Sequence, residues 1–451
     1  MPVTTIAVPA LGNRSHLVHD GRLGVVVDPP RDAAGLERAA EAAGVDIVAV
    51  ADTHIHNDYV SGGLSLARRH GADYLVAADE PVSFERVGVR GGDVLDYGDL
   101  ALEVLATPGH TRHHQSFLAR VPGETPALFS GGSLLLGTVG RTDLVDPRLA
   151  LHLAGAQWDS ARALAGLAPE TLLRPTHGFG SFCAGATAGP APDPDAATVG
   201  GQLGTNPALV SARAHFAAEL VAGFGPFPAY YRHMDPLNRS GGGTPVAARP
   251  VTAAQVESAL RAGAWVVDVR DRARHAAGHL PGSVGFEYGD SFATYVGWLV
   301  PWGEDLVLLS DDVETLEHAA HQLAGIGIEG VGAHVLDEAA ALESRFRRVT
   351  WDDYRAAAES LTGPRPVVVD VRQQDEWAAG HLPGAVHVPV QDVGRVVDAL
   401  PDGELWVHCR SGYRAGVAAS LLHRAGRSVL HVDDVWERVA ELAIPTIPAA
   451  A

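Results

Sequence analysis

Residues 265–284 read WVVDVRDRARHAAGHLPGSV, and residues 367–386 read VVVDVRQQDEWAAGHLPGAV. The two stretches align at an offset of 102 residues, so that Asp268 matches Asp370 and His279 matches His381. A repeat of this length is a whole domain, because the units of solenoid proteins are shorter. The sequence therefore predicts two domains of one fold in the second half of the chain.

Each copy of the repeat begins with a run of β-branched residues, followed by a His-Leu-Pro-Gly turn. A second apolar run follows at 306–309 in the first copy and at 405–407 in the second. Such runs are typical of buried parallel strands, and helical patterns such as 415–425 follow them. Strands that alternate with helices indicate α/β domains with parallel sheets, which we expect over residues 251–345 and 347–446.

The first half of the chain has a different character. Short strand-like runs alternate with helical stretches, at 24–27, 33–43, 47–50, 64–70, 74–77, 100–106 and 127–129. The Gly/Pro-rich segment Asn238–Pro250 has the composition of a linker. We therefore expect a layered α/β domain over residues 1–240, with a helical extension near 208–222 and its site on strand-end loops.

Composition limits the function. The chain has 451 residues, of which 46% are hydrophobic, and a formal net charge of −20, so its surface should repel nucleic acid and anionic membranes. The N-terminus lacks a signal-peptide pattern, and no apolar run is long enough for a membrane span. Because Cys183 and Cys409 are the only cysteines, a disulfide framework is excluded and a cytoplasmic location is favoured. The oligomeric state stays open.

Histidines follow several of the predicted strands of the first domain. His54, His56 and Asp58 lie in the segment THIHND after the apolar run 47–50, and His110 and His177 lie in similar turns. Imidazoles together with a carboxylate on rigid strand ends are suited to Zn²⁺ or Fe²⁺ with an open coordination position. The pattern therefore predicts a metal site.

Four segments together resemble the metallo-β-lactamase superfold: THIHNDYVSGG (53–63), ATPGHT (106–111), SGGSLLLGTVGRTDL (130–144) and RPTHG (174–178). The nearest branch is that of persulfide dioxygenases and hydroxyacylglutathione hydrolases. The resemblance implies an αββα sandwich with metal between its two sheets. By position it implies first-site ligands at His54, His56 and His110, and second-site or supporting roles for Asp58 and His177.

Two departures from the family pattern affect the metal site. Tyr59 stands where the family has a histidine, and Gly132 stands where it has a metal-bridging aspartate. We therefore expect one ion, Fe²⁺ or Zn²⁺, bound weakly or absent. Asp143 is a conceivable substitute ligand. We expect His113 and His114 to be solvated or supporting residues, and Cys183 to be a small buried residue.

A second candidate site follows the apolar run 405–407, where Cys409–Arg414 reads CRSGYR. At a strand-loop-helix junction, loop amides and the helix N-terminus stabilise a thiolate, and Arg410 and Arg414 would add full positive charges. Gly412 permits the tight turn. The predicted site consists of six residues, namely Cys409, Arg410, Ser411, Gly412, Tyr413 and Arg414.

Both copies of the repeat resemble the rhodanese family, and the six-residue loop of the second copy resembles its active-site cradle. The resemblance implies transfer of sulfane sulfur through a persulfide on Cys409, with Asp370, Arg372 and His381 as scaffold. In the first copy our alignment places Leu309 at the position of Cys409, followed by serine and two aspartates. We therefore expect the domain at 251–345 to be catalytically silent.

The combined pattern predicts a sulfur-metabolism enzyme that acts on small-molecule thiols, persulfides or thiosulfate. A rhodanese-type sulfurtransferase would be coupled to a metallo-β-lactamase-like domain that acts as a persulfide dioxygenase. Two alternatives stay open for the first domain. One is a zinc thioesterase similar to hydroxyacylglutathione hydrolases, and the other is a domain that binds a thiol or persulfide without catalysis.

Overall fold

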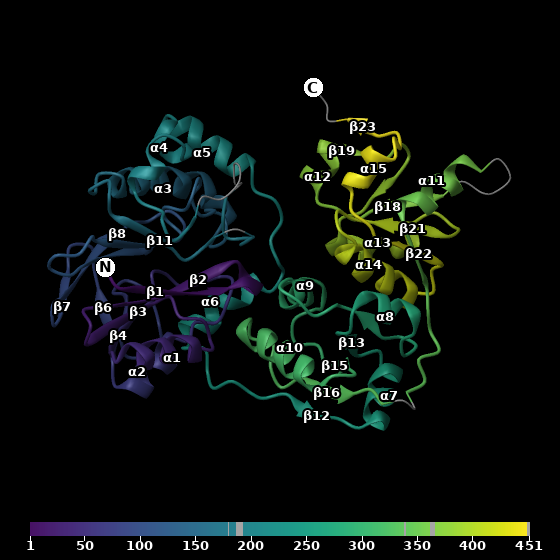
Figure 1. The fold of residues 1–451 in the computed structure, drawn as a ribbon, viewed down its shortest axis with the longest axis horizontal. Helices are drawn as coiled ribbons and strands as arrows, with labels where there is room; N and C mark the ends of the chain where they lie inside the picture. The colour runs from purple at the N-terminus through teal and green to yellow at the C-terminus, as the bar shows by residue number, and fades with distance from the viewer. Residues whose placement is uncertain (179, 186–192, 338–339, 361–365, 449–451) are drawn as a thin grey trace. The chain divides into compact units, whose positions relative to one another are not determined.

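The protein is described by a computed structural model that covers residues 1–178, 180–185, 193–337, 340–360 and 366–448 (Figure 1). It contains two compact units. The first consists of Met1–Pro245 with Ala324–Gly327, and the second of Val246–Leu323 with Ile328–Ala451. None of the helices in the described ranges is long and apolar enough to cross a membrane.

The first unit contains two β-sheets. One has the order β1-β2-β3-β4-β5-β6, with the bounds Val3–Val8, Asn13–His19, Leu23–Val27, Asp46–Ala51, Asp73–Ala77 and Val87–Val89. The other has the order β11-β10-β9-β8-β7, with the bounds Leu172–Pro175, Ala127–Gly131, Gln115–Arg120, Leu100–Ala106 and Val94–Tyr97. Both sheets are mixed. In the first, β1 to β3 pair antiparallel and β3 to β6 pair parallel. In the second, β7 to β10 pair antiparallel and β10 pairs parallel with β11.

The two sheets pack face to face, as the alternation of side chains along their strands shows. On β3, Val25 and Val27 point into a core shared with Phe117 and Phe129 of the other sheet. Val26, between them, points the opposite way, into a separate core that α1 (Ala34–Ala43) and α2 (Gly63–His70) cover. Because successive strand residues face opposite sides, one strand serves both layers.

The second sheet is covered in the same manner. Leu118 and Leu128 point away from the inter-sheet core and pack with residues of α3 (Ala150–Leu164) and α5 (Arg213–Ala222). The result is an αββα sandwich, as predicted. The remaining helices of this unit are α4 (Pro207–Val210) and α6 (Tyr231–Arg239).

The helical extension predicted near 208–222 is two helices, α4 and α5. The chain is extended at Ser211 and Ala212, between them. The Ser211 carbonyl accepts a hydrogen bond of 3.0 Å from Trp158 Nε1 of α3. We attribute the break to this contact, because a carbonyl that binds α3 is not available to continue the helix.

The second unit contains two parallel sheets, as the repeat predicted. The first has the order β12-β16-β15-β13-β14, with the bounds Arg249–Pro250, Gly332–Val335, Leu306–Ser310, Trp265–Asp268 and Val284–Gly285. The second has the order β17-β22-β21-β18-β20, with the bounds Arg347–Val349, Val429–Val432, Leu405–His408, Val367–Asp370 and Val386–His387. A short pair, β19 with β23, completes the strands at Gly380–His381 and Ile447–Pro448.

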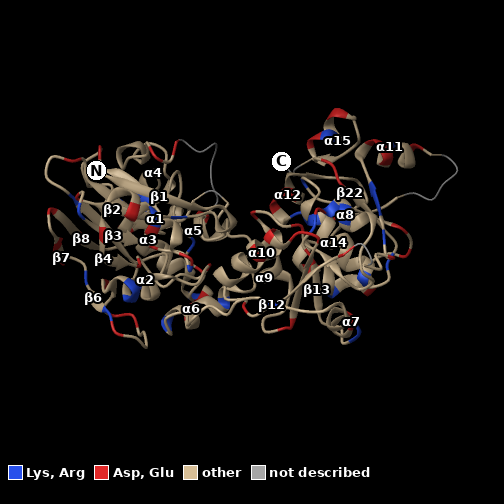
Figure 2. Cartoon of the chain, turned by 60° about the horizontal axis from the view of Figure 1, so that its bottom comes forward, with Lys and Arg blue, Asp and Glu red and all other residues tan. Residues whose placement is uncertain are grey.

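Helices connect the parallel strands of both repeats. In the first repeat they are α7 to α10, at Ala253–Arg261, Arg272–Ala277, Phe292–Leu299 and Val313–Gly325. In the second they are α11 to α15, at Trp351–Glu359, Gln374–Ala379, Val393–Val396, Tyr413–Arg424 and Glu437–Glu441. Acidic and basic residues are interspersed along both units, and every basic one is an arginine (Figure 2).

The strand register corrects our alignment of the two repeats by one residue. The aspartate at the end of β13 pairs with Leu309, whereas Asp370 at the end of β18 pairs with His408. The counterpart of Cys409 in the first repeat is therefore Ser310. Our alignment had matched Gly303 and Glu304 with Gly403 and Glu404. Because the turn before β15 is one residue longer than the turn before β21, that match misaligned the strands. A serine in this position still provides no thiol.

The Asp-x-Arg motif of each repeat forms a buried ion pair. Arg372 donates to Asp370 through Nε and a terminal nitrogen, at 2.9 and 2.6 Å, and to the Gly380 carbonyl at 2.7 Å. Its guanidinium also lies 3.8 Å from the ring centroid of Trp436. Asp268 and its arginine repeat the pairing in the first domain at 2.9 and 2.6 Å.

Removing one partner of this pair should destabilise the second repeat. In Asp370→Asn the Arg372 guanidinium, 3% exposed, keeps its charge but loses its counter-charge. We expect the free energy of unfolding to fall by about 3–5 kcal/mol, measured by urea denaturation. Asp402→Asn, at an exposed position, is the control and should change it by less than about 0.5 kcal/mol. Equal effects of the two substitutions would contradict the structural role.

Acid should destabilise the second unit through its buried histidines. Burial lowers the pKa of His408 and of His431 to about 4, from about 6.5 in the unfolded chain. Their stabilising effect is complete above pH 6.5 and is lost as the pH falls toward 4, by on the order of 2–3 kcal/mol for each imidazole. The pKa of Asp370 is lowered below its ordinary value by His408 and Arg372 despite burial, so its own stabilising effect persists through this window.

Tryptophan fluorescence can measure this loss in the full chain, because seven of the eight tryptophans follow residue 245. We expect the urea midpoint reported by fluorescence to decrease steadily between pH 7 and pH 4.5. In His431→Asn the decrease should be smaller. A midpoint that stays constant or rises over this range would contradict the assignment of neutral buried imidazoles.

Candidate functional sites

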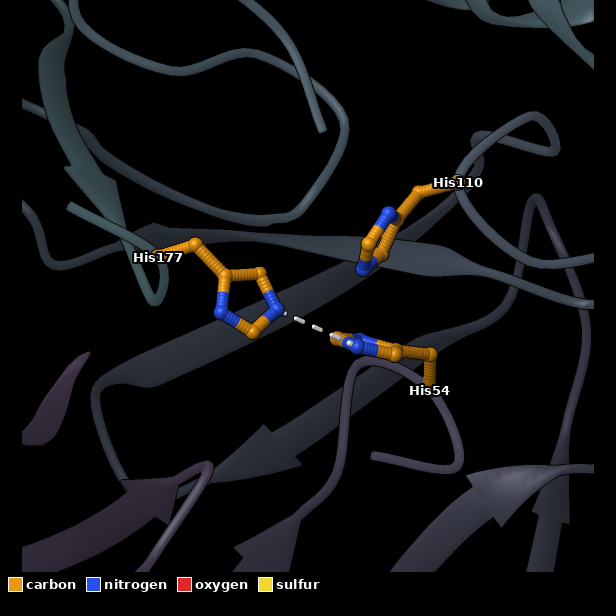
Figure 3. Close-up of side chains that lie close together, drawn as sticks. All are labelled: His54, His110 and His177. Atoms are coloured by element: carbon orange, nitrogen blue, oxygen red, sulfur yellow. Dashed lines mark hydrogen bonds between the residues drawn. The ribbon is translucent and has the colours of Figure 1, made fainter. Parts of the chain in front are cut away.

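Three histidines converge at strand ends of the first unit. His54 follows β4, His110 follows β8 and His177 follows β11, and all three side chains are buried. One ring nitrogen of each lies within 4.8 Å of the other two, and the Nε2 atoms of His54 and His177 are 3.4 Å apart (Figure 3). The sandwich thus gathers residues that are far apart in the sequence.

Hydrogen bonds at Nδ1 orient all three rings. His110 Nδ1 donates to the Arg141 carbonyl at 2.6 Å. His54 Nδ1 lies 2.8 Å from the hydroxyl of Thr53, and His177 Nδ1 lies 3.0 Å from Asn13 Oδ1. In each ring the Nε2 atom is the one that faces the others, and His110 Nε2 is buried without a hydrogen-bond partner. This is the arrangement of metal-ligating histidines, whose second nitrogen is held by a neighbour.

The other two predicted ligands form adjacent groupings. His56 Nε2 is 3.2 Å from Asp28 Oδ1, and Asp58 Oδ2 accepts a hydrogen bond of 2.6 Å from Asn13. His56, Asp58 and His177 have ligand atoms within 4.8 Å of one another, and so do Asp28, Asp52 and His56. His177 therefore belongs to two groupings. One is the trio of His54, His110 and His177, and the other also contains His56 and Asp58.

The protonation states of the trio and of His56 differ. Burial lowers the pKa of His54 well below its ordinary value, and lowers the pKa of His110 and of His177 to about 3. Burial also acts on His56, but the carboxylate of Asp28 outweighs it and raises that pKa. Conversely, burial would raise the pKa of Asp28, but His56 and several hydrogen bonds lower it to about 2. Three neutral imidazoles thus lie beside an ion pair of His56 with Asp28.

The two departures from the family pattern have clear structural consequences. A Cβ added at Gly132 would lie 2.2 Å from Cδ2 of His110, so the His110 ring fills the space of a side chain there. The Gly132 amide donates to His114 Nε2 at 2.9 Å, and the His114 ring stacks on His54 at 4.9 Å. His114 is therefore a buried supporting residue, one of the two roles that we expected for it.

Other candidate residues lie outside the trio. Tyr59 stacks on His56, with ring centroids 4.3 Å apart, and its hydroxyl donates to the Asp28 carbonyl. Asp143 accepts two hydrogen bonds from Arg141, at 2.7 and 2.8 Å, so its carboxylate is engaged by a guanidinium and is not a substitute ligand. Cys183 is fully buried, as expected, and burial raises the pKa of its thiol well above the ordinary value.

The second candidate site has the predicted strand-loop-helix form. Strand β21 ends at His408, Cys409 follows with 1% exposure, and α14 begins at Tyr413. Gly412 precedes the helix with φ +86°, and a Cβ there would lie 2.1 Å from an oxygen of Asp433. The loop therefore requires glycine at this position for both its backbone conformation and its packing.

The two arginines that we expected to support the thiol differ in burial. Arg414 is 14% exposed and forms hydrogen bonds of 2.5 and 2.8 Å with Glu376. Burial would lower the pKa of Arg414, but its hydrogen bond with Glu376 and the charges of neighbouring groups raise it. Arg410 is instead 67% exposed and pairs with Glu437 at 3.3 Å. Of the two arginines only Arg414 is mostly buried, and stabilisation of the thiolate by either one stays a prediction.

One aromatic residue that packs against this loop was not predicted from the sequence. Tyr295 lies on α9 of the first repeat, and its ring centroid is 5.5 Å from that of Tyr413. Burial raises the pKa of Tyr295 to about 12, with Arg414 and Cys409 among the neighbouring charges. Tyr295 precedes Cys409 by more than a hundred residues, and no motif around it pointed to the site.

Comparisons with known proteins agree with the two-part architecture. Residues 354–441 match the profile of the Rhodanese-like domain. A hydroxyacylglutathione hydrolase of Acidiphilium cryptum (strain JF-5) is 33% identical over 183 residues, which is 39% of this chain and 69% of that protein. A hydroxyacylglutathione hydrolase of Cereibacter sphaeroides (strain ATCC 17029 / ATH 2.4.9) is 33% identical over 187 residues, which is 40% of this chain and 68% of that protein.

The crystal structure of a metallo-beta-lactamase from Staphylococcus aureus subsp. aureus COL is similar over 75% of this chain and 99% of that chain. The TM-score is 0.64 and the sequence identity 24%, so the likeness concerns the fold. The two parallel sheets of the second unit fit two rhodanese-like domains, of which the second carries Cys409. The chain belongs to the metallo-β-lactamase-fold family that includes the hydroxyacylglutathione hydrolases, and it continues into rhodanese-like domains.

Proposed function

We propose that this protein is a sulfur-metabolism enzyme in which Cys409 accepts and passes on sulfane sulfur. The observation that carries this proposal is the position of Cys409, 1% exposed, in the loop between β21 and α14. The helix N-terminus and Arg414 would both favour an anion at the sulfur. The same features favour the persulfide anion that would replace the thiolate.

The proposed transfer proceeds in two displacements. The Cys409 thiolate attacks the outer sulfur of thiosulfate, so that a new S–S bond forms and the old S–S bond breaks with release of sulfite. An acceptor thiolate then attacks the outer sulfur of the Cys409 persulfide and leaves as a new persulfide, which restores the Cys409 thiolate. No external oxidant or reductant is needed, since the sulfur is only relayed.

Replacement of Cys409 tests this half of the proposal. Cys409→Ala should lower thiosulfate:cyanide and thiosulfate:thiol sulfurtransferase activity by roughly 1,000-fold or more, because the nucleophile is absent. Cys183→Ala is the matched control, and it should retain the activity. Full sulfurtransferase activity in Cys409→Ala would contradict the proposal.

For the first unit we propose a metal-dependent reaction on a low-molecular-weight persulfide. The residues present suit a metal ion, since neutral imidazoles converge and His110 Nε2 has no other partner. A bound Fe²⁺ would supply O₂ activation, and a bound Zn²⁺ would supply a Lewis acid. In the dioxygenase reaction a persulfide, O₂ and water give the thiol and sulfite. The chain's own residues hold the imidazoles neutral and keep the site buried.

A zinc thioesterase is the second candidate for this unit. The curated relatives that are 33% identical are named hydroxyacylglutathione hydrolases, which favours hydrolysis of a glutathione thioester. Tyr59 and Gly132 count against the two-metal site expected for that chemistry, because neither offers a ligand in place of the family's histidine and aspartate. The two candidates share a thiol-derived substrate and differ in their requirement for O₂.

Two assays separate these candidates. Protein purified without added metal should contain one Fe²⁺ per chain, and it should consume O₂ when given glutathione persulfide. Removal of the metal with a chelator should abolish this uptake, because the imidazoles alone cannot activate O₂. Hydrolysis of S-lactoylglutathione without O₂ uptake would instead support the thioesterase. Absence of both activities together with absence of metal would contradict a catalytic role for this unit.

A further inference from the structure

We propose that Arg272 of the first repeat is a positioning residue for the loop of the second repeat that carries Cys409. It acts through Asp433, whose carboxylate packs against this loop at Gly412. The inference rests on the proposed sulfur transfer at Cys409, and it gives a role in that transfer to the repeat that has no thiol. Both repeats belong to the same compact unit.

The loop between β21 and α14 is held in place by β22 and the segment that follows it. The Trp436 amide donates to the Arg410 carbonyl at 2.8 Å. His431 Nε2 donates to the Gly412 carbonyl at 2.9 Å, because a carbonyl can only accept. The loop is thus fixed at two points. Its backbone amides can stabilise an anion at the sulfur only while they keep this arrangement.

Asp433 packs directly against the same loop. Its side chain is 6% exposed, and a Cβ added at Gly412 would lie 2.1 Å from Asp433 Oδ1. The carboxylate therefore occupies the space beside the glycine. Burial would raise the pKa of Asp433, but the hydrogen bond from Arg272 and the neighbouring charges lower it, so the group is ionised at neutral pH. The loop conformation consequently depends on where this charged group is held.

Two arginines hold the carboxylate, one from each repeat. Arg272 Nε donates to Asp433 Oδ1 at 2.8 Å, and Arg348 Nε donates to Asp433 Oδ2 at 2.7 Å. Because Oδ1 is the oxygen that faces Gly412, the contact with the loop depends on Arg272. The guanidinium of Arg272 also pairs with Glu287 of its own repeat. A planar group bound by two carboxylates has little freedom to move.

A second contact from the first repeat reaches the start of α14. The Tyr413 hydroxyl donates to the Glu287 carbonyl at 3.3 Å. At the repeat offset of 102 residues, Arg272 matches Gln374 of the second repeat, and its partner Glu287 matches a proline, Pro389. Neither charge belongs to the scaffold that the two repeats share. Their presence in the first repeat alone favours a role at the contact with the second.

Substitution of Arg272 tests the inference in the full-length chain, with thiosulfate as sulfur donor and cyanide as acceptor. In Arg272→Gln the Asp433 oxygen beside the loop loses its charged partner, and we expect kcat to fall by roughly 10–100-fold. The KM for thiosulfate should stay within about 3-fold, because the loop is displaced while no contact to the donor is removed. A pair that only joined the two repeats would lower the urea midpoint and leave kcat unchanged.

Two matched variants separate the charge of Arg272 from its bulk and its location. Arg272→Lys keeps a cation that can donate to Asp433, and kcat should recover to within about 5-fold of the unmodified chain. Arg274→Gln removes an exposed pair with Asp311 from the same helix, α8, and should change kcat by less than about 2-fold. An unchanged kcat in Arg272→Gln, or an equal loss in either matched variant, would overturn the inference.

A double-mutant cycle tests whether Arg272 acts through Asp433. Asp433→Asn keeps the shape beside Gly412 but removes the charge, and by itself it should lower kcat as Arg272→Gln does. It also provides the test should Arg272→Gln fail to fold. Since the two residues act as one unit, the double variant should lose no more than about the larger of the two single losses. Losses that multiply, or full activity in Asp433→Asn, would contradict this route.

Cys409→Ala, assayed alongside, separates this inference from the proposed function. Loss of sulfurtransferase activity in Cys409→Ala together with full activity in Arg272→Gln would overturn the positioning role and leave the proposed sulfur transfer intact. Full activity in Cys409→Ala would overturn both.

Discussion

The first unit depends on the arrangement of three imidazoles that are buried, neutral and oriented by their outer nitrogens. The Nε2 atoms of His54 and His177 lie 3.4 Å apart, and His110 Nε2 is buried without a hydrogen-bond partner, so these converging ring nitrogens suit a metal ion. The fold maintains this arrangement through contacts from several elements. Asn13 comes from β2, Thr53 follows β4 and the Arg141 carbonyl lies in a loop after β10. The site therefore exists only when both sheets of the sandwich are in place.

In the second unit the candidate reactive group is a sulfur atom and not a metal site. One buried thiol, that of Cys409, lies in the loop before a helix, and we propose that the helix N-terminus favours an anion there. The two repeats have the same parallel topology and the same Asp-x-Arg ion pair. Only the second has a cysteine directly after the middle strand of its sheet, β21. A shared scaffold with one thiol explains why a duplicated domain would carry a single sulfur site.

Much of the architecture could be predicted from the sequence, because it depends on local periodicity. The apolar run 24–27 indicated the strand that became β3, and the repeat indicated two parallel sheets. The exact pairing was harder to predict, since one extra residue in a turn moved Ser310 into the position that we had given to Leu309. Register depends on the partner strand, and a single sequence does not contain that information.

The ligand set was the least predictable feature. The motif THIHND identified His54 and His56 as neighbours, but it could not show that His56 turns toward Asp28 while His54 turns toward His177. Asp28 and Asn13 decide these directions, and both come from distant segments without a recognisable motif. The most direct test is anomalous X-ray diffraction at the zinc edge from crystals of the Zn²⁺-loaded full-length chain. Our account predicts a peak at the buried cluster that contains His54, His110 and His177, and the absence of a bound ion there would contradict it.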